Sequence, residues 1–438
     1  MASLQPRATL DDVRAILTSF ASAFARERLL GPRQVVVTLL IMIRGHCGYK
    51  RGLDTVSALL GAEFGWGKLP PSPGSFSKAR HKLLPAEMLA MYRLALESPS
   101  AVAARNRWRW RGFRLVAADG SRFLLPAHDP LIEAYLRPLV AGGEAYQPQL
   151  LQMTLWDVGA CQPLTWCQRP CRGKGNGERA LLMELLPSLS ATDLLLLDRG
   201  FPSRRMLFEL VAREIPFVAR MTAGTSADFA EVAAFLASGQ ADAEVDFSYR
   251  DPDCTPALVE RLRLVRDVDE DGHDCVLVTS LMDRRQFPVS DLVQVYYRRW
   301  GIEVAFRDMK IRYRIESFHG TTPQMVEQEI IALMFLLLIE SLVEEAALAT
   351  IPASERGHGD EERPKRCNRA ALGDRIMNLL TLAGQASTCR SRWREYHRGL
   401  AATAHDRARV RRPDRERDRQ CLSQFGRWRF RRSPAKAA

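Results

Sequence analysis

Residues 293–310, VQVYYRRWGIEVAFRDMK, are the stretch that decides how this 438-residue chain is interpreted. They predict one helix carrying Tyr296, Arg299, Glu303 and Lys310 at the spacing Y-x2-R-x3-E-x6-K. At about 100° per residue, these side chains fall at roughly 0°, −60°, −20° and −40° around the helix, within one narrow stripe. Helices usually turn such groups to solvent, so this stretch alone leaves a solvated face and a functional face equally open.

Two short apolar runs elsewhere in the chain each end in an aspartate. RLVAAD ends at Asp119 before Gly120, and DLLLLD ends at Asp198 before Arg199-Gly200. Such runs are typical of buried strands of a parallel or mixed sheet, and open α/β sheets bind ligands beyond the carboxyl ends of their strands. We therefore expect both aspartates at one edge of the sheet. For either aspartate alone, a turn after a strand is an equally good explanation.

The three acids Asp119, Asp198 and Glu303 suit a hard cation. Carboxylates without a nearby Cys/His cluster favour Mg²⁺, which keeps part of its shell for water and phosphate oxygens. Two such ions about 3.5–4 Å apart stabilise both the attacking and the leaving oxygen of a phosphoryl displacement. The predicted chemistry is cleavage or transfer of a phosphodiester, with Arg299 and Lys310 contacting phosphates.

Together, these residues resemble the motifs of a known family, the bacterial insertion-sequence DDE transposases with the YREK signature. Its three motifs occur here in the family's order, and the resemblance covers most of the chain, from about residue 11 into the C-terminal tail. The motifs are Asp119-Gly120-Ser121, Asp198-Arg199-Gly200-Phe201 and the set Tyr296, Arg299, Glu303 and Lys310.

The resemblance implies an α/β fold with an RNase H-like catalytic core. It also implies that Asp119, Asp198 and Glu303 are the catalytic residues and hold two Mg²⁺ ions, for which Mn²⁺ can substitute. The implied activity is that of a cut-and-paste transposase of the hairpin-forming type. Such an enzyme cleaves the terminal inverted repeats and joins the freed 3′-OH ends to target DNA.

The same resemblance implies that Tyr296, Arg299 and Lys310 contact DNA near the transposon end. Trp300 is a further DNA-binding candidate, because it can stack on an unpaired base, although a core tryptophan is at least as good an interpretation. Arg220, at the end of a predicted strand, is a candidate phosphate clamp. The partners implied are double-stranded DNA, as transposon end and as target, and a second copy of the chain in the DNA complex.

Two other functions remain open from the residues. One is a catalytically inactive or domesticated transposase-derived protein that binds DNA without cutting it, although the presence of all three acids speaks against this. The other is a metal-dependent nuclease without strand transfer, since the same carboxylates serve both reactions. Joining of a 3′-OH end to a second DNA separates these functions.

Changes in periodicity and composition along the chain predict a division into domains. Residues 1–105 are expected to form a helical N-terminal DNA-binding domain, with helices over 10–24, 34–44 and 75–96 and a basic cluster at 78–82. The catalytic core is expected over 106–221 and 285–350, interrupted by a mainly β insertion domain at 222–284 and ending in a buried helix at 323–349. Residues 351–368 are a predicted linker, and 369–438 a helical region with an arginine-rich tail for DNA contact or dimerisation.

Composition agrees with a polyanionic partner. The net charge is +12 and the isoelectric point about 9.5, and residues 407–432 hold eleven arginines against three acids. Nine cysteines without a secretion signal favour reduced thiols in a bacterial cytoplasm, at the nucleoid. The apolar runs at 35–43 and 330–339 are too short to span a bilayer.

A glycine-rich segment precedes Glu178. The spacing of Gly173, Gly175 and Gly177 is not that of a P-loop and lacks the following Lys-Ser/Thr, so no nucleotide cofactor is expected. Glu178 itself is open to two interpretations. It is either an auxiliary acid near the metal ions or, with more weight, an acid at a helix N-terminus favoured by the helix dipole.

Overall fold

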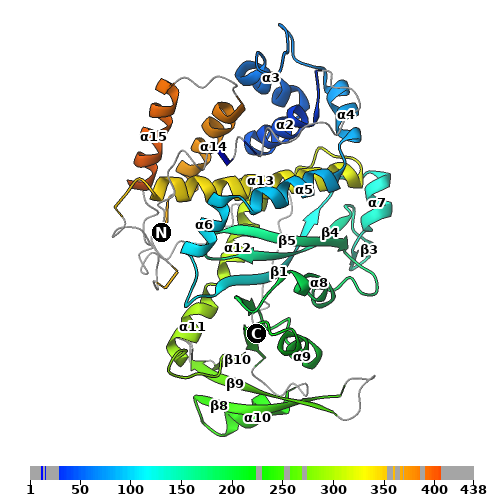
Figure 1. Cartoon of the computed structure of the whole chain (residues 1–438). Coiled ribbons are helices and arrows are strands. Elements are labelled where there is room, and N and C mark those ends of the chain that lie inside the picture. The colour runs from blue at the N-terminus through cyan, green and yellow to red at the C-terminus, as the bar shows by residue number, and fades with distance from the viewer. Residues whose placement is uncertain are drawn as a thin grey trace, which may run out of the picture.

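The computed structural model describes residues 29–222, 229–250, 257–268, 274–352, 359–360, 366–367, 369–384 and 390–405, together with Asp11, Asp12 and Ala15. The predicted helix at 10–24, apart from those three residues, and the arginine-rich stretch at 407–432 lie outside this part of the chain. Figure 1 shows a helical layer, one long helix beneath it and a twisted sheet below that helix.

An eight-stranded sheet in the order β5-β4-β1-β6-β7-β10-β9-β8 forms the centre of the fold. Its strands are β1 (Arg114–Leu124), β4 (Gln149–Asp157), β5 (Gln162–Pro170), β6 (Asp193–Leu197), β7 (Phe217–Met221), β8 (Asp242–Tyr249), β9 (Leu258–Val268) and β10 (Asp274–Thr279). β1, β6 and β7 run parallel to one another, and all other pairs are antiparallel. The small hairpin of β2 (Leu139–Val140) and β3 (Gly143–Glu144) stands apart. This mixed α/β sheet is consistent with an RNase H-like core.

The segment expected to form an insertion domain adds strands to the same sheet. Its described residues hold α10 (Ala230–Ala237) and the strands β8, β9 and β10. β10 pairs with β7, with Leu277 opposite Arg220, and β9 and β8 follow outward. Figure 1 shows these strands at the lower end of the molecule, continuing the twist of the central strands.

Alternation along the strands gives the sheet two apolar faces. Val116 and Ala118 of β1 face one core, which is covered by α8 (Glu178–Leu185), α9 (Arg204–Ala212) and α10. Leu115 and Ala117 face the other side, which is covered by α11 (Val289–Tyr297), α12 (Trp300–Arg307) and α13 (Pro323–Leu348). Because side chains alternate with period two, Asp119 belongs to the α11/α12 face and Gly120 to the α8 face.

Helix α13 joins the sheet to the helical layer. It begins at the cap Thr322, whose Oγ1 accepts a hydrogen bond from the Met325 N–H at 3.4 Å. Its apolar run is buried on all sides, as expected for a helix that is hydrophobic all round. This confirms the prediction of one buried helix at 323–349. In the part of the chain that the structure describes, no helix is long and apolar enough to cross a membrane.

The remaining helices come from both ends of the chain (Figure 1). Above α13 lie α2 (Pro32–Gly45), α3 (Tyr49–Leu60), α4 (Pro73–Lys82), α14 (Arg369–Gly384) and α15 (Arg390–His405). In the same view α5 (Pro85–Leu96) runs alongside α13, α6 (Pro99–Arg107) lies below it, and the small α7 (Asp129–Tyr135) lies beside the sheet. The single helix predicted at 75–96 is wrong. Pro85, which cannot continue a helix but can start one, begins α5.

Arg80 is separated by the structure from the exposed cations around it. Its side chain is 0% exposed. It donates from Nε to Gln328 Oε1 at 3.0 Å, from Nη1 to Glu329 Oε1 at 3.0 Å and from Nη2 to the Met325 carbonyl at 2.8 Å. The expected DNA contact is therefore wrong for this member of the basic cluster, because Arg80 ties α4 to α13 and reaches no solvent.

Candidate active site

The two predicted aspartates lie on neighbouring parallel strands at the same level. Ala118 of β1 is paired with Leu197 of β6, so Asp119 and Asp198 follow one residue further along each strand. Strands are about 4.8 Å apart, and residues at one level of a parallel pair share a face. The prediction that β1 ends at Asp119 is wrong, because β1 continues to Leu124 beside β4, whereas β6 stops at Leu197. The sheet is thus open on the β6 side of Asp119.

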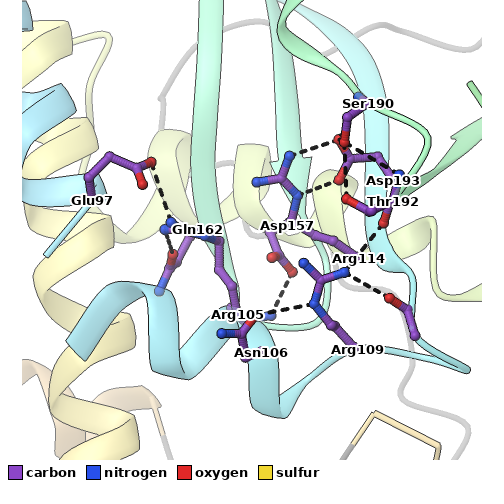
Figure 2. Close-up of polar contacts among 12 residues, drawn as sticks. Glu97, Arg105, Asn106, Arg109, Arg114, Asp157, Gln162, Ser190, Thr192 and Asp193 are labelled. Carbon is purple, nitrogen blue, oxygen red and sulfur yellow. Dashed lines mark hydrogen bonds and ion pairs between the residues drawn. The ribbon is translucent and has the colours of Figure 1, made fainter. Parts of the chain in front are cut away.

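An ion pair at the far end of the same two strands fixes this register. Arg114 donates to the two carboxylate oxygens of Asp193 at 2.7 and 2.9 Å, and these two residues are themselves opposite each other in the β1–β6 pairing. Figure 2 shows the contact beside Ser190, which also donates to Asp193. A one-residue slip would break this bidentate contact, so the pair keeps Asp119 level with Asp198.

Arg220 extends the same row across the sheet. Leu197 of β6 is paired with Ala219 of β7, so Arg220 follows at the level of Asp198. Its charge also acts on the phenol of Tyr296. The structure therefore brings this candidate to the edge where the two aspartates lie.

Asp119 sits in a crowded electrostatic environment. Burial raises the pKa of its carboxyl to about 6; the N–H of Gly120, which donates to Oδ1 at 2.9 Å, and the charge of Arg299 lower it, and the charges of Glu178 and Glu303 raise it. Acids from three separate elements thus act on one another. A cation placed among them would relieve this repulsion.

The predicted helix over 293–310 is wrong as a single element. α11 ends at Tyr297, α12 starts at Trp300, and a π-helical turn, η2 (Asp308–Arg312), follows. At the junction the N–H groups of Arg298 and Arg299 bond to the carbonyls three residues back, at 3.1 and 2.9 Å, which tightens the turn.

Three of the four stripe residues nevertheless converge. Arg299 is 4% exposed, and its Nη2 donates to Glu303 Oε1 at 2.6 Å. The guanidinium carbon lies 6.0 Å from the centre of the Tyr296 ring, and Asp198 acts on both side chains. Burial raises the pKa of Tyr296 to about 12, so its phenol stays a hydrogen-bond donor at neutral pH. Arg299 Nε is buried without a hydrogen-bond partner.

Lys310 and Trp300 lie at the margin of this cluster. Lys310 Nζ is 5.4 Å from the centre of the Phe123 ring on β1 and 4.0 Å from Glu316 Oε1. Trp300 is 56% exposed, so the alternative of a core tryptophan is wrong. Its indole is available to a partner.

Glu178, which the sequence left open, lies against the site. A Cβ added at Gly120 would stand 2.5 Å from Glu178 Oε1, so the carboxylate occupies the space that a side chain would fill. The neighbouring Arg179 donates from Nε to the Gly200 carbonyl at 2.7 Å, which ties the start of α8 to the loop after Asp198.

The chemical type of these ligands, carboxylate oxygens, suits a divalent cation. The charges of Glu178 and Glu303 act on Asp119. Arg299, whose buried Nε–H has no partner, interacts with Asp198 and Glu303. Within the residues that the structure describes, no three His, Cys, Asp or Glu side chains already converge as a metal-binding group. Glu303 is instead engaged by Arg299, which supplies the positive charge among the acids.

Part of the chain is similar to a known family, the transposase DDE domain. The model of that family matches residues 171–339, a segment that includes Asp198 and Glu303 and begins after Asp119. Its members generally use divalent metal ions.

More particularly, the chain is similar to transposase InsG for insertion sequence element IS4 of Escherichia coli (strain K12). The two are 27% identical over 232 residues, which is 50% of this chain and 50% of the relative, so the chain spans about half the length of the curated relative it matches. A solved structure, the piggyBac transposase synaptic complex with hairpin DNA, aligns over 90% of this chain and 82% of its own at 12% identity and a TM-score of 0.45. The family match and the curated relative thus make parts of this chain similar to transposases.

Proposed function

We propose that this chain is an insertion-sequence transposase that binds the terminal inverted repeats, cleaves the transposon ends by metal-dependent phosphoryl transfer and joins their 3′-OH ends to target DNA. The observation that supports it most directly is the row formed by Asp119, Asp198 and Arg220 at one level of three parallel strands. Arg299 and Glu303 cover this row from the α11/α12 junction.

Asp119, Asp198 and Glu303 are the residues we propose to hold two Mg²⁺ ions, with Mn²⁺ as a substitute. When bound, such ions supply the charge that stabilises the attacking and leaving oxygens of an in-line displacement. Before that, Arg299 keeps the acids compatible with the fold by pairing with Glu303 at 2.6 Å.

The cations and aromatic groups position the DNA strand. Arg299 has an N–H without a partner and a planar guanidinium suited to phosphate oxygens, and Tyr296 beside it offers a phenol O–H. Arg220 adds a charge at the level of Asp198. Trp300 presents an exposed indole for stacking, and Lys310 provides a further phosphate contact along β1.

Cleavage and joining are two displacements of the same kind. In the first, a water oxygen attacks phosphorus at the transposon end, the bond to the 3′ oxygen breaks and a 3′-OH is released. In the second, that hydroxyl attacks a target phosphodiester and displaces the target's own 3′ oxygen, so one phosphodiester replaces another. Neither step needs a covalent bond to the protein, because positioning and electrostatics supply most of the catalysis.

The test is processing of a labelled duplex that carries the element's own end, followed on denaturing gels with Mg²⁺. We expect nicking and joining by the intact protein and loss of both in Glu303→Gln, with DNA binding retained. Glu184→Gln, an exposed acid on α8 paired only with Arg169 on the surface, is the matched control and should cut normally.

The other possible outcomes contradict particular parts of the proposal. Cutting that survives in Glu303→Gln overturns the assignment of Glu303. Binding without cutting by the intact protein indicates an inactive or domesticated derivative, and cutting without joining indicates a nuclease. The same gels separate hairpin ends from simple nicks, and light scattering with bound DNA tests the homodimer that we propose for the DNA complex.

A further inference from the structure

We infer that Glu178 is a fourth carboxylate of the divalent-cation site, an assignment that rests on the proposed function. The inference starts from Gly120. A methyl group at this position would collide with three atoms of the Glu178 side chain, at 2.5, 2.7 and 2.7 Å. The carboxylate therefore depends on the lack of a side chain immediately after Asp119.

The local sheet geometry opens a path from Glu178 to Asp119. Gly120 faces the α8 side of the sheet and Asp119 the other side, so an intact sheet would keep the two acids apart. β6 ends at Leu197, opposite Ala118, and no β6 residue is paired with β1 beyond that point. Glu178 can thus approach Asp119 around the free side of β1, and the two charges already act on each other.

The start of α8 is held in place by the second aspartate motif. Arg179 donates to the Gly200 carbonyl at 2.7 Å, two residues after Asp198. The start of α8 therefore lies beside Gly120 on one side and is tied to the loop after Asp198 on the other. Glu178 is exposed, and it forms no ion pair within the part of the chain that the structure describes.

A second feature points to a ligand among the acids that interact with Asp119. Arg299 is only 4% exposed, and its Nε lacks a hydrogen-bond partner. This open donor belongs to a guanidinium that contacts Glu303 and interacts with Asp119 and Asp198. It calls for an oxygen-bearing ligand such as a phosphate, whose charge the acids alone would repel. A divalent cation held by the acids removes that repulsion.

The experiment measures Mn²⁺ binding to the full-length protein without DNA, by the loss of the free-ion electron paramagnetic resonance signal. We expect Glu178→Gln to weaken the site about 10-fold or more, as loss of a metal-orienting or metal-binding carboxylate does, and Glu184→Gln to leave it unchanged. Gly120→Ala should weaken it in the same direction, because the new methyl displaces the Glu178 carboxylate. The double variant should be no weaker than Glu178→Gln alone.

The outcomes separate this inference from the proposed function. If Asp119→Asn loses Mn²⁺ and Glu178→Gln does not, the fourth carboxylate is refuted and the proposed function stands. If neither substitution changes Mn²⁺ binding, the proposed metal site itself is refuted. If Glu178→Gln only lowers the melting temperature, Glu178 serves the α8 dipole and the inference fails. A Gly120→Ala loss that adds fully to that of Glu178→Gln refutes the proposed route through the glycine.

Discussion

Replacing Arg80 by methionine should destabilise the protein without touching DNA binding directly. Arg80 is fully buried, and its partner Glu329 is 2% exposed. Removing one member of a buried pair leaves the other as an uncompensated charge, at a cost of about 3–5 kcal/mol. The carbonyl of Met325 and the amide of Gln328 lose donors as well. We therefore expect the free energy of unfolding in urea to fall by at least the lower end of that range.

The pH dependence of this effect has a definite sign. Burial opposes ionisation of Glu329, but hydrogen bonds from His319 and the charge of Arg80 outweigh it and lower its pKa below 4.5. A group with a lowered folded pKa adds stability above the unfolded pKa, and this is lost as pH falls through the folded value. Without Arg80, the deficit of the variant should be full at pH 7 and shrink in acid, where Glu329 is protonated in both states.

The assay compares Arg80→Met with Lys78→Met by urea and thermal unfolding and by DNA affinity. Lys78 is an exposed cation on the same helix, so its loss should change stability by no more than about 0.5 kcal/mol. The double variant Arg80→Met/Glu329→Met should regain part of the loss, since an apolar pair often replaces a buried ion pair at little cost. An Arg80→Met protein that is as stable as the intact chain but binds DNA poorly would refute the structural role.

Four further predictions concern the site and the buried acids near it. Trp300→Ala should weaken DNA binding by about 1–3 kcal/mol, the usual worth of base stacking, and leave the melting temperature unchanged, as fluorescence anisotropy and calorimetry will show. Mn²⁺ binding should tighten as pH rises from about 5 to 7, because the pKa of Asp119 is about 6 and only its ionised form binds; a flat titration contradicts this. The metal-free melting temperature should fall over the same range, since raised folded pKa values at Asp119 and Asp157 add stability only while protonated, and Asp157→Asn should flatten that fall. Lys310→Ala should lower the salt slope of DNA binding by about one with cleavage of bound DNA retained.

Local sequence predicted the elements that carry the site better than it predicted how they end. The strand before Asp198 and the buried helix α13 follow from apolar runs of the right length. The end of β1 could not be predicted, because Asp-Gly is a common turn and only pairing with β4 keeps the strand going through Gly120. Helix α11 ends at Tyr297 in a tight turn, and Arg299 is buried there by tertiary contacts. Hydrophobic periodicity carries no information about such contacts.

Burial separated residues that look alike in the sequence. Arg80 and Lys78 belong to one basic cluster, yet one is in the core and the other in solvent. For Glu178 the sequence left two interpretations open, an auxiliary acid and an acid at a helix start. It could not decide between them, because the approach of Glu178 to Asp119 depends on β6 being shorter than β1. The sequence shows a glycine at position 120, but only the fold shows why a side chain would not fit there, because a carboxylate from α8 approaches closely.

The balance of charge explains why one arginine serves the proposed site in two states. Four carboxylates, counting Glu178, face the two guanidiniums of Arg220 and Arg299, which leaves two net negative charges among partly buried groups. Without Arg299 the repulsion that already raises the pKa of Asp119 would increase, and the edge would be costly to fold. Two divalent cations held by these acids would reverse the net sign, so a DNA phosphate would be attracted where it is now repelled. Arg299 would then no longer have to neutralise Glu303, and its guanidinium, together with the Nε–H that has no partner in the described structure, would be available to the phosphate.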